Sequence, residues 1–263
     1  MKVSIITVVY NGASSIRQCI ESVVRQDYNN IEYIIIDGQS TDETLATVYE
    51  YQESIHTIIS EPDRGIYDAM NKGIQRATGD VIGMLNADDR YTDTSVISDI
   101  VAALRSSQAE AVYGDLVYVH PSDPSQATRT WISGAYRSAS FLWGWMPPHP
   151  AFFLKKKWYD QYGTFRLDLG SSADYELMLR MLYKHKLSPV YLPRVLVQMS
   201  TGGVSNSTLS NRIQANKNDR KAWRVNSLKP YFFTLWLKPI RKIVQFFPLA
   251  KKLTNDSFQP FTN

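Results

Sequence analysis

The stretch MLNADDR, residues 84–90, leads from two apolar residues directly into an amide and two adjacent carboxylates. Carboxylate and amide oxygens are the ligands that Mg²⁺ and Mn²⁺ prefer in proteins. Polar side chains also follow three earlier apolar runs of the chain. They are Tyr10 and Asn11, then Asp37, then Glu61 and Asp63.

The elements that must position these residues alternate through the first half of the chain. Apolar runs of strand length cover 3–9, 31–37, 56–60, 80–85 and 109–119. Segments with helical spacing cover 16–25, 40–52, 67–77 and 95–106, and Ser14 or Ser15 is the expected cap of the first. Such alternation indicates an α/β fold with a mainly parallel sheet covered on both faces. Because ligands bind at the carboxyl ends of parallel strands, the polar residues are predicted to share one edge, called here the acidic rim.

The pattern weakens beyond residue 120. We expect a turn-rich loop at 121–126, a strand at 129–133, an aromatic, Pro-rich segment at 143–156, a helix at 172–185 and one or two strands at 189–199. The chain is therefore divided into two halves, 1–119 and 120–219, and a tail, 220–263.

Composition excludes several classes of protein. With 263 residues and 44% hydrophobic content, the chain can bury a sizeable core and is not disordered throughout. The single cysteine, Cys19, excludes a disulfide framework and a Cys-based zinc site and fits a reducing compartment. The amino terminus lacks the features of a secretory signal and no stretch is long enough to span a bilayer, so a cytoplasmic protein is expected.

The tail has a distinct charge. Residues 220–252 contain nine Lys or Arg and no Asp or Glu, although the whole chain carries only +4. Apolar stretches bracketed by basic residues favour a segment that lies on an anionic membrane surface, at the inner face of the cytoplasmic membrane. The alternative is a helical hairpin that packs on the domain or joins two subunits. An acidic rim and a basic, aromatic tail do not fit a nucleic-acid binder.

The acidic rim would repel bare phosphate, and the sequence has neither a GxGxxG after its first strand nor a GxxxxGK[ST]. A divalent cation could bridge the rim to a nucleoside diphosphate sugar and stabilise the departing diphosphate. Transfer then needs a base for the acceptor hydroxyl. Asp174 in SSADYELMLRM is the candidate, because the start of a helix favours a carboxylate there. A role as a helix cap is the alternative.

These motifs resemble family 2 glycosyltransferases of the GT-A fold, of the type that builds bacterial surface polysaccharides. The resemblance lies in VSIITVVYNG, IEYIIIDGQSTDET, SEPDRGIYDAMNKGI and the DXD-like LNADD. It continues more weakly through HPAFF, ADYELMLR and TGGVS, to about residue 205. It implies a cofactor, Mn²⁺ or Mg²⁺, and a UDP-sugar as the default donor.

The resemblance also implies roles for single residues. The nucleotide would lie beside Thr7, Tyr10, Asn11, Asp37, Asp63, Lys72, Asn86 and Ala87, with Asp37 on the base and Asp63 and Lys72 near ribose or diphosphate. Asp88 would bind the metal with support from Asp89, and Asp174 would be the base. Asn86 replaces the usual first Asp of the motif, and Ala173 replaces the acidic residue that commonly precedes the base. Both departures weaken any inference about metal affinity.

Three further residues are candidates for the acceptor side. His149, between two prolines, could contact the acceptor or the diphosphate, or make a structural hydrogen bond. Trp145, with Trp143 and Phe152, could form a wall for sugar stacking or belong to the core. Gly203 suggests a loop that closes over the site, with a plain turn as the alternative.

The sequence therefore predicts a metal-dependent, inverting glycosyltransferase that moves a sugar from a nucleoside diphosphate to a hydroxyl of a saccharide or lipid-linked saccharide. Residues 1–119 would bind the nucleotide sugar and 120–219 the acceptor. One alternative is a sugar-phosphate nucleotidyltransferase, but VVYNGASS lacks the basic residues that its loop after the first strand would need. The other is a non-catalytic, membrane-bound protein that only binds nucleotide or saccharide.

Overall fold

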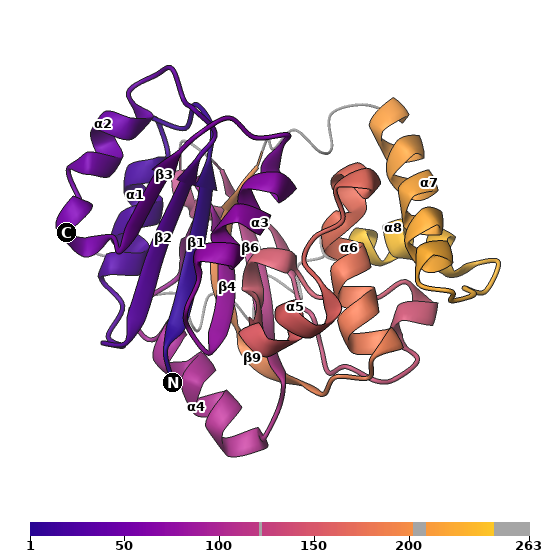
Figure 1. Ribbon diagram of the computed structural model, residues 1–263. Coiled ribbons are helices and arrows are strands. Elements are labelled where there is room, and N and C mark those ends of the chain that lie inside the picture. The colour runs from indigo at the N-terminus through magenta and orange to yellow at the C-terminus, as the bar shows by residue number, and fades with distance from the viewer. Residues whose placement is uncertain (121–122, 202–208, 245–263) are drawn as a thin grey trace.

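The computed structural model describes residues 1–120, 123–201 and 209–244. One sheet runs through the molecule, with helices on both of its faces and a group of helices at one end (Figure 1). The strand order is β3-β2-β1-β4-β8-β6-β9-β5, and β7 pairs with β6. This mixed, mainly parallel sheet confirms the predicted fold class. The two predicted halves share it, and their exact boundaries remain predictions.

The first half is built from parallel strands joined by helices. The strands are β1 (Val3–Val9), β2 (Ile31–Asp37), β3 (Thr57–Ser60) and β4 (Val81–Asn86). The helices are α1 (Ile16–Val24), α2 (Thr44–Tyr49), α3 (Ile66–Arg76) and α4 (Val96–Ser107). These elements match the predicted ones, except that the second helix is shorter, begins at Thr44 and is followed by a short turn, η1 (Gln52–Ser54).

The remaining strands form both parallel and antiparallel pairs. They are β5 (Asp89–Tyr91), β6 (Ala111–His120), β7 (Asp123–Trp131), β8 (Phe152–Lys155) and β9 (Pro189–Ser200). β8 runs antiparallel between β4 and β6, whereas β9 is parallel to β6. β5 follows β4 almost at once, yet pairs antiparallel with β9. The predicted loop at 121–126 was wrong from Asp123 onwards, because the hairpin pairing of β7 with β6 begins at that residue.

The remaining helices are η2 (Ser140–Trp143), η3 (His149–Ala151), α5 (Lys156–Tyr162), η4 (Leu167–Ser172), α6 (Ala173–Met178), the π-helical η5 (Leu179–Lys184), α7 (Leu209–Val225) and α8 (Thr234–Val244). The helix predicted at 172–185 is thus an α-helix that continues as a π-helix. Of the remaining helices, α6, α7 and α8 lie on the side of the molecule away from α2 and β3 (Figure 1). None of the helices in the described ranges is long and apolar enough to cross a bilayer.

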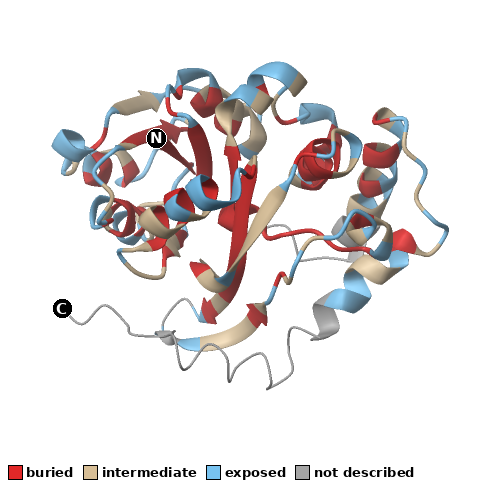
Figure 2. Ribbon diagram, turned by 90° about the horizontal axis from the view of Figure 1, so that it is seen from below, coloured by how far each residue is buried: buried red, intermediate tan, exposed pale blue. Residues whose placement is uncertain are grey.

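The core lies in two layers, one on each face of the sheet. Along β1 and β2, Ile5 and Ile35 belong to one hydrophobic cluster, whereas Ile6 and Ile34 belong to the other. This alternation follows from the two-residue period of a strand, and both sets are completely buried (Figure 2). Continuous apolar strands therefore hold the sheet rigidly between helices and leave only its edges for function.

Candidate active site

The carboxyl ends of the parallel strands meet at one edge, as the sequence predicts for the acidic rim. In register, Val9 lies opposite Asp37, Val8 opposite Asn86, and Asp37 opposite Ser60. Asp37 and Asn86 therefore come from separate stretches of the chain and lie on either side of the end of β1.

Asp37 is completely buried, and only one of its carboxylate oxygens has partners. Oδ2 accepts hydrogen bonds from the backbone N–H of Ser40 at 3.0 Å and the hydroxyl of Ser60 at 2.6 Å. Oδ1 has no partner in this structure. A buried oxygen without a partner is costly, so Asp37 is suited to receive a donor group from a ligand.

The loops that follow β1 and β2 are tied together through Asn11. Its backbone is left-handed, with φ of 50°, and its side-chain oxygen accepts a hydrogen bond from the Thr41 N–H at 2.8 Å. Its own N–H donates to the Ser40 hydroxyl at 2.8 Å. Tyr10, the residue before it, is 65% exposed. The rim thus presents an exposed aromatic ring one residue after Val9, which lies opposite Asp37 in the sheet.

Asp63 and Lys72 lie beyond β3 and are held by local contacts. Asp63 Oδ1 accepts a hydrogen bond from the Gly65 N–H at 2.7 Å. A Cβ at Gly38 would lie 2.5 Å from Asp63 Oδ2, so only glycine lets this carboxylate approach the end of β2. Lys72 pairs with Glu61 at 3.0 Å and donates to the Pro62 carbonyl at 2.6 Å. Lys72 would have to exchange these partners to contact a phosphate.

The DXD-like residues lie between β4 and β5. Asn86 donates a hydrogen bond to Asp89 Oδ2 at 2.9 Å, whereas Asn86 Oδ1 and Asp89 Oδ1 are buried without partners. Asp89 is 1% exposed, and its burial together with the charge of Asp88 raises its pKa well above the usual value. Asp88 is exposed at the rim, although partial desolvation by the surrounding protein also raises its pKa. Ala87, between Asn86 and Asp88, is buried.

This donor set fits a divalent cation. Two neighbouring carboxylates repel each other and carry raised pKa values, and a positive ion would relieve both effects. The unpartnered oxygens of Asn86 and Asp89 are hard donors of the kind that Mg²⁺ and Mn²⁺ prefer. Within the described residues, no group of three or more His, Cys, Asp or Glu side chains is arranged to hold a metal. The ion would therefore depend on Asp88, Asp89 and oxygens from a ligand or water.

Asp174 lies in the first turn of α6, and the Ser172 before it occupies the capping position. Its Oδ1 accepts a hydrogen bond from the Tyr175 N–H at 2.7 Å. The Tyr67 hydroxyl of α3 also hydrogen-bonds to Asp174, and burial followed by the charge of Asp174 raises the pKa of Tyr67 well above its usual value. Asp174 is therefore held between the two halves of the protein and does not cap α6 itself.

The rings of Tyr67, Phe165 and His149 pack together. The Phe165 ring lies 5.4 Å from Tyr67 and 5.3 Å from His149. Asn71, one turn along α3 from Tyr67, exchanges two 2.9 Å hydrogen bonds with the backbone of Phe165. His149 is 8% exposed; burial lowers its pKa, and the charge of Asp174 partly offsets this effect. His149 is thus a neutral ring packed close to Asp174, and its predicted contact with a ligand stays a prediction.

Tyr118 is influenced by both acidic parts of the site and was not singled out from the sequence. Burial raises its pKa, Arg129 opposes the shift, and the charges of Asp89 and Asp174 both add to it. The Arg129 guanidinium lies 4.4 Å from the Tyr118 ring centroid. The charges of both carboxylates therefore act on one tyrosine of β6. A tyrosine inside an apolar strand gives no local signal of this position.

Of three other predicted residues, two are buried and one lies outside the described residues. Thr7 is completely buried, with its hydroxyl 3.2 Å from Tyr33 Oη, so its contact with a nucleotide stays a prediction. Trp145 is 4% exposed and donates a hydrogen bond to the Ser133 carbonyl at 2.7 Å. It belongs to the core, the alternative that the sequence left open. Gly203 lies outside the described residues.

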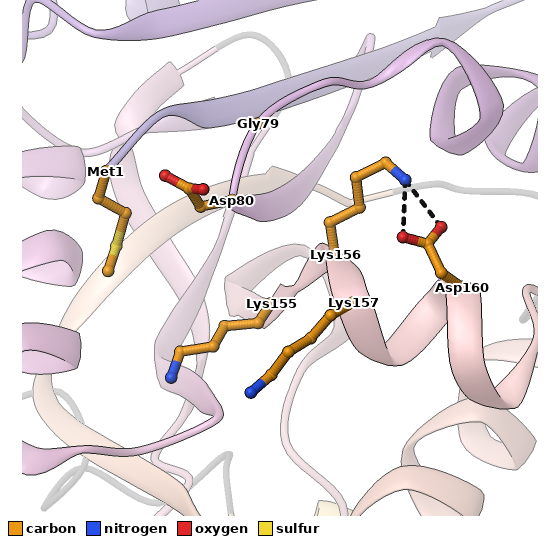
Figure 3. A pocket seen from close by; sticks show the side chains of 7 residues that line it. All are labelled: Met1, Gly79, Asp80, Lys155, Lys156, Lys157 and Asp160. Atoms are coloured by element: carbon orange, nitrogen blue, oxygen red, sulfur yellow. Dashed lines mark hydrogen bonds and ion pairs between the residues drawn. The ribbon is translucent and has the colours of Figure 1, made fainter.

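A hollow of about 430 Å³ lies at the opposite edge of the sheet, where β1 and β4 begin (Figure 3). Its cationic side chains are already paired with acids. Lys156 binds Asp160 at 2.7 Å, and Lys155 and Lys157 both reach Glu110, at 3.4 and 3.0 Å. Paired lysines on a surface do not make an anion site, so the acidic rim remains the candidate active site.

Comparisons with known proteins show the family of the chain. The sequence profile described as Glycosyl transferase family 2 matches residues 4–167, more than half of the chain. An uncharacterized glycosyltransferase of Mycobacterium tuberculosis is 32% identical over 211 residues, which cover 77% of this chain and 76% of that protein. A PGL/p-HBAD biosynthesis glycosyltransferase of Mycobacterium bovis is 29% identical over 209 residues, 78% of this chain and 79% of that protein.

Solved structures share the fold at low sequence identity. TarS of S. aureus, in complex with UDP-GlcNAc, superposes with a TM-score of 0.69 at 16% identity, over 90% of this chain and 69% of that one. The mannosyltransferase PcManGT of Pyrobaculum calidifontis, in complex with GDP-Man and Mn²⁺, gives 0.58 at 15% identity, over 97% and 83%. With this fold and the family profile together, the chain belongs to glycosyl transferase family 2 and is a glycosyltransferase.

Proposed function

We propose that this glycosyltransferase moves a sugar from a nucleoside diphosphate, with inversion and with a divalent metal, to a hydroxyl of a saccharide or lipid-linked saccharide. The observation that carries the proposal is the pair of buried carboxylates at the acidic rim, Asp37 and Asp89, each of which leaves one oxygen without a partner. An inverting transfer needs a site for the metal and the diphosphate, and a base for the acceptor hydroxyl, for which Asp174 is the candidate. UDP-GlcNAc in TarS and GDP-Man with Mn²⁺ in PcManGT support the class of donor.

The donor would lie along the acidic rim. The unpartnered Oδ1 of Asp37 would accept a hydrogen bond from the nucleobase, and Tyr10 would pack against it. Asp88, with Asp89 and the oxygen of Asn86, would hold Mn²⁺ or Mg²⁺ against the diphosphate. When bound, the ion offsets the negative charge that grows on the departing diphosphate. A UDP-sugar is our default donor.

Asp174 would act on the acceptor. Its carboxylate takes the proton from the acceptor hydroxyl while that oxygen bonds to the anomeric carbon. The bond from the anomeric carbon to the diphosphate oxygen breaks on the opposite face, so the configuration inverts, and the proton then leaves Asp174 for solvent. The hydrogen bonds from Tyr67 and the Tyr175 N–H fix the direction of the carboxylate. We also propose the cytoplasm as the compartment, in keeping with the one buried cysteine.

The test separates binding from chemistry with two variants. Donors are first screened by thermal shift with Mn²⁺, because a ligand that binds the native state raises its melting temperature. Asp174→Asn should lower transfer by roughly 10²–10⁴-fold while nucleotide binding stays unchanged. Asp88→Ala should abolish transfer and also weaken the Mn²⁺-dependent binding.

Two outcomes would contradict the proposal. Full turnover by the Asp174→Asn protein would remove this residue from the mechanism. Nucleotide binding with neither transfer nor donor hydrolysis in the wild type would favour a non-catalytic binding protein. Formation of a nucleotide sugar from a nucleoside triphosphate and a sugar phosphate would instead identify a nucleotidyltransferase.

A further inference from the structure

Exposed aromatic side chains gather where α8 begins. Phe232 is 89% exposed, Trp236 65% and Trp143 52%. The Phe233 ring connects them, because its centroid lies 5.2 Å from Phe232 and 5.3 Å from Trp143. We call this surface the aromatic face; it consists of Trp143, Tyr231, Phe232, Phe233, Trp236 and Ile240. Apolar patches of this kind on a protein surface mark interaction sites.

The opposite side of α8 is firmly anchored on the second half. Thr234 donates a hydrogen bond to the Leu142 carbonyl at 2.7 Å, and Leu235 is 3% exposed. Lys238 pairs with Asp219 at 2.8 Å and lies 3.7 Å above the Tyr175 ring. The turn at Gly144 lies directly beneath α8: a Cβ at this position would be 2.6 Å from the backbone nitrogen of Lys238. The aromatic face is therefore presented by a fixed helix.

The spacing of the exposed residues follows from this anchoring. Trp236 and Ile240 are four residues apart in α8, so they share one side of the helix, and Phe232 lies in the turn just before it; Ile240 is 54% exposed. Thr234, Leu235 and Lys238 point to the other side, toward the protein. A helix with one packed side and one apolar exposed side needs a second surface on which to dock.

The charge around the aromatic face identifies the kind of partner. Residues 228–244, which carry most of the face, contain no acidic residue, and Lys229 and Arg241, at either end of the face, are exposed. Aromatic rings and cations together suit a bilayer interface: the rings enter the headgroup region and the cations meet anionic lipid. A buried protein interface would instead be depleted of charge at its core.

We propose that the aromatic face docks this glycosyltransferase on the surface of an anionic lipid bilayer. The inference deepens the proposed function and rests on it for one point only, the acceptor. Tyr175, beneath Lys238, directly follows Asp174 in α6, so docking would hold α6, the helix that carries the base, directly behind the docked helix α8. An acceptor carried on a lipid would then reach the base without leaving the bilayer.

The experiment is a vesicle sedimentation assay with the full chain. Vesicles of phosphatidylglycerol and phosphatidylcholine in equal parts are compared with vesicles of phosphatidylcholine alone. The wild type should sediment with the anionic vesicles and lose affinity in high salt. Phe232→Ser with Trp236→Ser should weaken binding about 100-fold, roughly tenfold for each ring withdrawn from the interface. Arg241→Ala should weaken it about fivefold.

Tyr49→Ser is the matched control, since Tyr49 is 52% exposed on α2, at the other end of the molecule. It should bind vesicles like the wild type. All variants should keep the Mn²⁺-dependent donor binding of the wild type, so loss of docking is measured separately from failure of the proposed reaction.

Three results would overturn the proposal. The wild type could fail to sediment with anionic vesicles. The double variant could bind them as well as the wild type, which would assign binding to another surface or to residues 245–263. A dimer in solution that dissociates in the double variant, without vesicle binding by the wild type, would show that the aromatic face covers a second copy of the chain.

Discussion

Buried carboxylates at the two edges of the parallel sheet differ in how many of their oxygens have hydrogen-bond partners. At the acidic rim, Asp37 and Asp89 are buried and each leaves one carboxylate oxygen without a partner. At the edge where the strands begin, Glu32 is 6% exposed, and both of its oxygens accept hydrogen bonds. They accept hydrogen bonds from Lys2, Ser4 and Thr78 at 2.5–2.7 Å.

The pKa values of Glu32 and Asp89 are shifted in opposite directions. Burial alone would raise the pKa of Glu32, but the hydrogen bonds from Lys2, Ser4 and Thr78 outweigh it and lower the value to about 2. Burial also raises the pKa of Asp89, and the neighbouring charge of Asp88 adds to the shift. One edge thus uses its carboxylate to stabilise the fold, whereas the other keeps carboxylates in an unfavourable state that a bound cation would relieve.

Asp89→Asn tests the acidic rim directly. The amide has nearly the same shape but removes a buried charge, so transfer should fall about 10–100-fold, as for residues that support a metal ligand. The free energy of unfolding in EDTA at neutral pH should rise by roughly 1–3 kcal/mol, since an unsatisfied buried group becomes less costly. Steady-state kinetics and urea unfolding measure the two effects. A variant that is both less active and less stable would contradict the comparison.

Glu32→Gln should give the reverse result at the other edge. With a pKa near 2 in the folded state, the carboxylate stabilises the native protein above pH 4.5, its usual value, and this contribution disappears as the pH falls toward 2. The variant should lose about 2 kcal/mol at pH 7, after allowance for solvent screening at Lys2, which is 35% exposed. Its transfer rate should match the wild type. Equal stability at pH 7, by urea unfolding, would refute the role given to Glu32.

Tyr67→Phe sharpens the comparison within the site. Removing the hydroxyl that hydrogen-bonds to Asp174 should lower kcat about tenfold and leave the donor KM unchanged, because the base alone loses a contact. The matched control at the other edge is Tyr28→Phe, which removes a hydroxyl that donates to the Met1 carbonyl. That variant should turn over normally. A changed donor KM with an unchanged kcat would place Tyr67 on the donor side instead.

The acidic rim could be predicted from the sequence because each of its residues lies at or close to the end of the strand that positions it. Each strand of the first half is a continuous apolar run, and the polar residue after it marks the carboxyl end. Asp37 and Asn86 could therefore be assigned to one edge before any coordinates. The predicted capping of α1 by a serine side chain was wrong. Ser15 directly precedes this helix, but its hydroxyl makes no capping hydrogen bond and instead donates to the Gly12 carbonyl.

The rest of the site depends on contacts between distant segments. Tyr67 meets Asp174 across the two halves, and Ser60 reaches Asp37 from a neighbouring strand. Neither tyrosine nor serine has a distinctive residue type or spacing in its own segment. The pairing of β5 with β9 joins Asp89 to Met199 and has no periodic pattern, because only three residues take part. Such contacts emerge only when the whole sheet is assembled.

The short step between β4 and β5 has a consequence for engineering. Only Ala87 and Asp88 separate a strand paired with β1 and β8 from one paired with β9, so both ends of the step are pinned. One inserted residue would turn the side chains of β5 to the opposite face of its pairing. The distance from Asn86 to Asp89 is therefore a fixed dimension of the protein. A designer who wants a different donor sugar must change the surrounding loops and leave this step at its present length.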